Sequence, residues 1–110
     1  MNLNHLHINV PSVEKATRFY TEFFDFKLES THRAGVFLIN NSNFLLAIDT
    51  YAEGDAPIEF PSWFHLGFCL DTSKNVKDLY EKMKSMGIEF AREYKEFDDK
   101  AANFYCWAPG

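Results

Sequence analysis

The sequence predicts an α+β fold made of two βαβββ modules, with the last strand of the second module missing from its 110 residues. Two observations predict this fold. When the chain is laid on itself at an offset of 60 residues, similar side chains coincide without a gap from position 5 to position 28. In each copy, the alternation typical of a strand is followed by the spacing typical of an amphipathic helix. We therefore expect mixed sheets that curve around a shared cleft, with the helices outside.

The first module opens with a strand over residues 3–10. Three aliphatic side chains point to one face of this strand, and His5, His7 and Asn9 point to the other. A helix is expected over residues 12–25, because its apolar side chains recur at helical spacing and bury one stripe.

The rest of the first module is a run of short strands. They are expected over residues 27–31, 35–39 and 44–50, with a hairpin turn at residues 40–43. A linker over residues 51–62 follows, since it contains one glycine and two prolines.

The second module repeats the pattern and then stops. A strand is expected over residues 63–70 and a helix over residues 73–86 that ends at Gly87, followed by strands over residues 88–95 and 101–107. The counterpart of the 44–50 strand does not follow. We expect either residues beyond Gly110 or a partner chain to fill this place, because an unpaired sheet edge invites pairing. A ferredoxin-like βαββαβ domain is the alternative fold, but it does not explain the repeat.

Composition describes a single domain over residues 1–110, with module one at 1–50, the linker at 51–62 and an incomplete module two at 63–110. The 46% apolar and 25% charged residues are typical of a globular protein. No apolar run could cross a bilayer and no signal peptide opens the chain, so a cytoplasmic protein without a membrane partner is expected. The net charge of −5 and the absence of a basic run argue against nucleic acid.

Two residue types stand out in the composition. Cys69 and Cys106 form no CxxC pair, so we expect both to be small buried hydrophobes rather than zinc ligands or a disulfide. Aromatic residues make up 17% of the chain. They could line a cavity for an apolar or planar ligand, or form an aromatic core and a dimer interface.

His5 and His65 occupy the same position in the two copies. If the modules pack around a pseudo-twofold axis, the two imidazoles converge, and neutral imidazoles are good ligands for divalent Fe, Mn, Ni, Co or Zn. The alternative is that each is an ordinary strand histidine with its hydrogen bonds satisfied. A catalytic metal would also need a third protein ligand.

Residues 3–20, with their strand histidine, their valine five positions later and Phe19-Tyr20 in the following helix, resemble the opening of the vicinal oxygen chelate superfamily. This superfamily includes glyoxalase I, fosfomycin and bleomycin resistance proteins, and extradiol dioxygenases. Residues 64–68, with Asp71 and the helix that follows, are similar to its second module. Residues 104–109 resemble its aromatic strand before an Asp-Pro-Asp-Gly turn.

The resemblance implies that His5 is the first metal ligand and His65 the second. The usual third ligand is a glutamate just past the Asp-Pro-Asp-Gly turn, which this sequence does not reach, and Ala108 stands where the turn has an aspartate. In the fourth strand, where some members place another glutamate, this chain has Ala47. Asp49, at the same strand parity, is the substitute candidate.

The resemblance also implies a function. Metal-bearing members act on small molecules with vicinal oxygens, as lyases, transferases or dioxygenases, and use the cation as a Lewis acid. Bleomycin-type members hold no metal and sequester an antibiotic between subunits, and a small-molecule sensor is a third possibility. A homodimer is expected in each case.

Several side chains on or beside the strands could line a substrate pocket. They are His7, Phe37, Asp49, Arg92, Tyr105 and Trp107, with Arg33 and Trp63 as further candidates. An arginine would hold a carboxylate or phosphate, and a ring would stack on a planar group. His32, beside a turn, is expected to be a solvent-facing loop residue.

Overall fold

The computed structural model describes residues 1–52, 54–57, 59–98 and 101–109. The chain divides into two compact units. The N-terminal unit is Met1–Phe64 together with the residues after Trp107, and the C-terminal unit is His65–Trp107. No helix in these ranges is both long enough and apolar enough to span a membrane.

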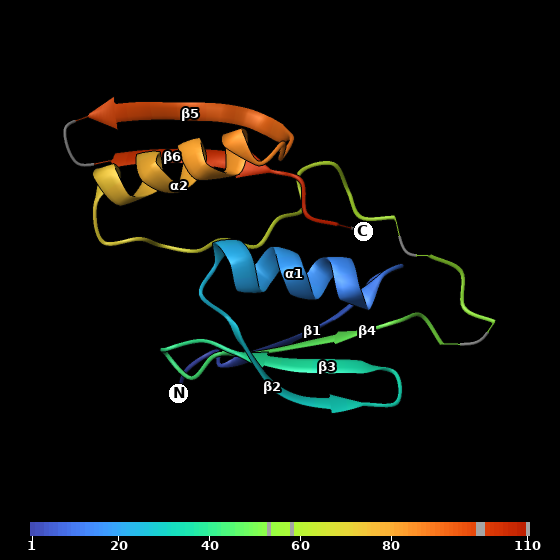
Figure 1. The fold of residues 1–110 in the computed structure, drawn as a ribbon. Coiled ribbons are helices and arrows are strands. Elements are labelled where there is room, and N and C mark those ends of the chain that lie inside the picture. Colours follow the sequence, from blue (N-terminus) through green and yellow to red (C-terminus); the bar gives the residue numbers. More distant parts are fainter. Residues whose placement is uncertain (53, 58, 99–100, 110) are drawn as a thin grey trace. The chain divides into compact units, whose positions relative to one another are not determined.

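The N-terminal unit is a βαβββ module, as predicted (Figure 1). Its elements are β1 (His5–Asn9), α1 (Val13–Phe23), β2 (Lys27–His32), β3 (Gly35–Ile39) and β4 (Leu45–Asp49). The strands form one sheet in the order β1-β4-β3-β2, in which β1 and β4 are parallel and the other pairs are antiparallel.

Helix α1 covers one face of this sheet (Figure 1). The side chain of Ser12 caps the helix by accepting a hydrogen bond from the Lys15 amide at 3.2 Å. The apolar side chains of α1 pack against the sheet and remove four sheet side chains almost fully from water. The burial of each contributes about 1.5–3 kcal/mol to the stability of the fold. They are Val36, Leu38, Leu46 and Ile48.

The predicted hairpin turn at residues 40–43 is confirmed. The side-chain oxygen of Asn40 accepts hydrogen bonds from the Ser42 and Phe44 amides, at 3.0 and 2.9 Å. Asn43 closes the turn with a φ of +60°, a left-handed conformation that asparagine tolerates better than most residues.

The C-terminal unit contains α2 (Ser73–Ser85), β5 (Phe90–Asp98) and β6 (Ala101–Cys106). Thr72 caps α2, and the chain leaves the helix at Gly87 with a φ of +81°, as the sequence predicts. Strands β5 and β6 pair antiparallel, and the ring of Tyr80 on α2 packs against Phe90 and Phe104 of this hairpin.

Strand β5 carries extra residues that change which way its side chains point. Phe90 pairs with Cys106 and Arg92 pairs with Tyr105, so a step of two residues on β5 corresponds to a step of only one residue on β6. Such a bulge places Arg92 on the opposite face from Phe90. Because Phe90 faces α2, Arg92 and Tyr105 share the face that points away from the helix.

The strand expected over residues 63–70 is not formed, and that prediction is wrong. In the N-terminal unit the equivalent strand, β1, pairs with β4 and with no other strand. The described residues of the C-terminal unit form one further sheet, the β5–β6 hairpin, and residues 63–70 do not pair with it. Cys69, which was expected to be buried, lies in this segment and is exposed.

Candidate functional site

A polar row crosses the sheet of the N-terminal unit on the face opposite α1. The strand register aligns Asn9 with Asp49, Asp49 with Gly35, and Gly35 with His32. Two residues earlier on each strand, His7 aligns with Ala47. This places His7, Asp49 and His32, which are far apart in the sequence, on one surface.

The carboxylate of Asp49 joins two histidines. Its Oδ2 lies 3.0 Å from Nε2 of His7, and its Oδ1 lies 2.6 Å from Nε2 of His32. A carboxylate only accepts hydrogen bonds, so Nε2 of His32 donates to Oδ1 of Asp49, whereas Nε2 of His7 lies within ion-pair distance of Oδ2. A histidine held through Nε2 in this way can present the lone pair of Nδ1, which is the arrangement of a histidine oriented by an acid for proton transfer.

His32 contacts Asp49 although the sequence analysis did not name it as a candidate. It is exposed, as expected, but it ends strand β2 rather than lying in a loop. Its side chain is 33% exposed, and its ring packs on Phe37 with centroids 4.8 Å apart. The signal that could have found it is its pairing with Gly35 across a two-residue turn. Arg33, in that turn, is exposed.

His5 lies on the same sheet face, two residues before His7. Its Nδ1 is 2.7 Å from the side-chain oxygen of Asn4. If Nδ1 donates this hydrogen bond, Nε2 carries the lone pair, as in metal-binding histidines whose second nitrogen is fixed by a partner. His5 aligns with Leu45, and Asp49 is four residues beyond Leu45, roughly 13 Å along the strand. Asp49 therefore belongs with His7 and His32 rather than with His5.

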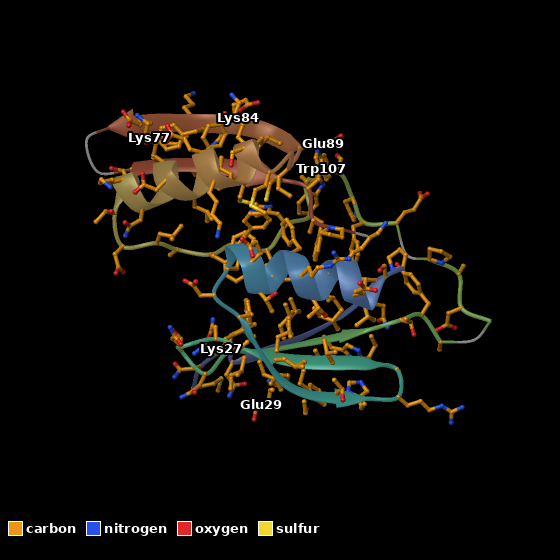
Figure 2. The ribbon with its side chains drawn as sticks, in the orientation of Figure 1. Lys27, Glu29, Lys77, Lys84, Glu89 and Trp107 are labelled. Atoms are coloured by element: carbon orange, nitrogen blue, oxygen red, sulfur yellow. The ribbon has the colours of Figure 1, made fainter. Side chains whose placement is uncertain are left out.

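The C-terminal unit gathers the remaining candidates around β5 and β6. The ring of His65 meets the ring of Tyr105 edge-on at 5.3 Å, and the guanidinium of Arg92 lies 4.9 Å from the centre of the Tyr105 ring. Trp107 is 57% exposed, and its amide donates a hydrogen bond to the carbonyl of Glu89. Figure 2 shows these last two residues side by side.

In the described ranges, no three histidine, cysteine, aspartate or glutamate side chains are arranged to hold a metal ion. The residues proposed from the sequence fall in both units. His5, His7, Phe37 and Asp49 belong to the N-terminal unit, and His65, Arg92, Tyr105 and Trp107 belong to the C-terminal unit.

Comparison with known proteins identifies the family of this chain. A family model described as the Glyoxalase/Bleomycin resistance protein/Dioxygenase superfamily matches residues 2–106. No curated protein matches the sequence.

Solved structures share the fold. A possible glyoxalase from Bacillus cereus superposes with a TM-score of 0.82 at 25% identity, covering 100% of this chain and 92% of that chain. A fosfomycin resistance protein mutant from Listeria monocytogenes, complexed with Mn(II) and 1S,2S-dihydroxypropylphosphonic acid, gives 0.72 at 18% identity, with 96% and 83% covered. Lactoylglutathione lyase from Agrobacterium tumefaciens gives 0.67 at 17% identity, with 98% and 86% covered.

Proposed function

The chain belongs to the Glyoxalase/Bleomycin resistance protein/Dioxygenase superfamily, and from this premise we propose that it is a divalent-metal-dependent enzyme acting on a small molecule with vicinal oxygens. The proposal includes His5 and His65 as two of the metal ligands. A bound ion would act as a Lewis acid on the substrate oxygens.

The observation that carries the proposal is the hydrogen bond between His5 and Asn4. A metal-binding histidine almost always has its second ring nitrogen held by a partner, which fixes the tautomer and the ring orientation. Asn4 is placed to do this for His5 at 2.7 Å. His65, its counterpart in the sequence repeat, has its ring against Tyr105.

Asp49 and the two histidines that contact it, His7 and His32, supply groups that could move a proton. The carboxylate holds Nε2 of His32, and the Phe37 ring packs on the same imidazole, so the position of Nδ1 is fixed on both counts. His32 in its neutral form would accept a substrate proton at Nδ1, and Asp49 would stabilise the imidazolium that results. His7 is held by the second oxygen of the same carboxylate.

A second function is favoured by a different observation. The part of the chain that the structure describes provides no set of three metal-binding side chains, and several large aromatic side chains are exposed. Both features suit a metal-free protein that sequesters a small molecule or an antibiotic. In that case aromatic stacking would supply the affinity.

Metal analysis separates the two functions. We would load the protein with Mn²⁺, Ni²⁺ or Zn²⁺, remove free ions, and measure the bound metal by inductively coupled plasma mass spectrometry. For the enzyme, His5→Ala and His65→Ala should each lose most of the bound metal, because a site with fewer ligands binds weakly. His7→Gln is the matched control, since it removes a histidine from the same strand face and should leave the metal bound. Negligible metal in all four proteins would support the sequestering function instead.

A further inference from the structure

Arg92 has two buried hydrogen-bond donors without partners. Its Nε and Nη2 atoms are shielded from solvent and make no hydrogen bond in the structure. Guanidinium groups stay charged at any physiological pH, so both donors are always present. Leaving such donors unpaired costs free energy, and an unpaired buried group calls for an explanation such as an absent ligand.

The two donors lie on one edge of the guanidinium. The N–H of Nε and the outer N–H of Nη2 are parallel, and together they form the side-on fork that binds both oxygens of a carboxylate or two oxygens of a phosphate. The unpaired atoms of Arg92 are therefore the pair that a single oxoanion would satisfy.

Aromatic rings flank the guanidinium. Its central carbon lies 4.9 Å from the ring centre of Tyr105 and 5.4 Å from that of Phe97. These contacts hold the group by cation–π attraction without using its N–H groups. Phe97 is 52% exposed and Tyr105 37% exposed, so both rings also offer apolar surface to a ligand.

The nearby carboxylates have other partners. Glu93 accepts a hydrogen bond from Tyr80, and Glu96 accepts one from Tyr94 at 2.7 Å. In the described part of the chain no carboxylate forms an ion pair with Arg92, while Lys95 adds a second positive charge 5.2 Å from the Phe97 ring centre. Two cationic side chains, Arg92 and Lys95, thus lie beside the Phe97 ring.

A third unpaired atom lies on the same face of the β5–β6 hairpin. The side-chain oxygen of Asn103 is buried without a hydrogen-bond partner. Asn103 is two residues from Tyr105 on β6, so the alternation of the strand places both on the face away from α2.

We propose that Arg92, between Tyr105 and Phe97, binds the oxoanion of an acidic organic small molecule, a carboxylate or a phosphate carried on an apolar body. His65 meets Tyr105 at 5.3 Å, which brings the bound acid close to one proposed metal ligand. The identification of this acid as the substrate rests on the proposed function. Binding of the acid does not, because every group named belongs to the C-terminal unit.

The test titrates the whole metal-free chain with benzoate, inorganic phosphate and benzyl alcohol, the last as a neutral match for benzoate. Binding is followed by calorimetry and by the Nε–Hε resonance of Arg92 in a ¹H–¹⁵N spectrum. We expect benzoate to bind saturably and to shift that resonance, and benzyl alcohol to do neither. If inorganic phosphate binds as tightly as benzoate, the site is one for phosphate groups.

Variants identify the fork. Arg92→Lys keeps the charge but loses the paired donors, so benzoate should bind about tenfold more weakly, and Arg92→Gln should not bind it. Lys77→Gln removes an exposed positive charge from α2, on the other face of the hairpin, and should bind benzoate within about twofold of wild type. Absence of benzoate and phosphate binding in the wild type, or equal binding in Arg92→Gln, would overturn the proposal. Loss of metal in His5→Ala with benzoate binding unchanged would show the two sites to be separate.

Discussion

Gly35 leaves the space that the carboxylate of Asp49 occupies. A Cβ atom at position 35 would lie 2.5 Å from Oδ1 of Asp49 and 1.8 Å from the carbonyl oxygen of Ile48. Since Oδ1 is also the atom that bonds His32, the absence of a side chain at Gly35 is what allows the two histidines to share one carboxylate.

Gly35→Ala should therefore destabilise the protein and break the His32 contact. Because the clash includes backbone as well as a side chain, we expect a loss of about 1–3 kcal/mol in the free energy of unfolding. Chemical denaturation measures it. Gly67→Ala is the matched control, since a Cβ there meets nothing within 4 Å and should change stability little. Equal stability of Gly35→Ala and wild type would contradict this account, because it would mean that the strands can move apart to make room for the Cβ atom.

Asp49→Asn should disturb the tautomers of the two histidines that contact Asp49. The two rings face different carboxylate oxygens, and in the amide one of these oxygens is replaced by an NH₂ group, which cannot accept a hydrogen bond from Nε2. Long-range ¹H–¹⁵N spectra of the imidazoles should show Nε2-protonated rings in the wild type and a mixture of tautomers in the variant. Asp55→Asn, an exposed aspartate outside the cluster, should leave both rings unchanged. Unchanged tautomers in Asp49→Asn would mean that the carboxylate does not orient them.

Tyr94 should ionise at unusually high pH. Its phenol donates a hydrogen bond to Glu96 at 2.7 Å, and this bond, with desolvation and the nearby negative charge, raises the pKa of Tyr94 from 10.0 to about 12. The folded-state pKa is raised, so the contribution to stability is present below pH 10 and is lost as pH rises toward 12.

Absorbance at 295 nm measures this ionisation. The difference between the titrations of wild type and Tyr94→Phe should give a midpoint about two pH units above that of an ordinary tyrosine. In Glu96→Gln the midpoint should fall back toward the ordinary value, because the accepting carboxylate is gone. If the midpoint of Tyr94 is the same in Glu96→Gln as in the wild type, the hydrogen bond to Glu96 is not the cause of the raised pKa.

The fold could be predicted where the pattern is local. The strand over residues 35–39 was predicted at its observed bounds, and both helices within two residues, because alternation, capping residues and apolar stripes act within one element. The strand over residues 63–70 was not, because a strand also needs a partner. Alternation alone does not provide one.

The site was harder to predict for the same reason. His7, Asp49 and Arg92 could be proposed as pocket residues from their strand positions. The position of His32 beside Asp49 depends on the pairing of His32 with Gly35, and the orientation of Arg92 depends on a bulge in β5. Phe90 and Arg92 would share a face in a regular strand, and only the partner strand shows that they do not.

The central claim is that His5 and His65 bind one metal ion. The most direct measurement is X-ray absorption fine structure on the Zn²⁺-loaded protein, which counts imidazole ligands through their multiple scattering. Two imidazole nitrogens at about 2.0–2.1 Å are expected in the wild type and in His7→Gln, and one on the small fraction of Zn²⁺ that His65→Ala still binds. A wild-type spectrum without imidazole scattering, or two imidazoles retained in His65→Ala, would contradict the account.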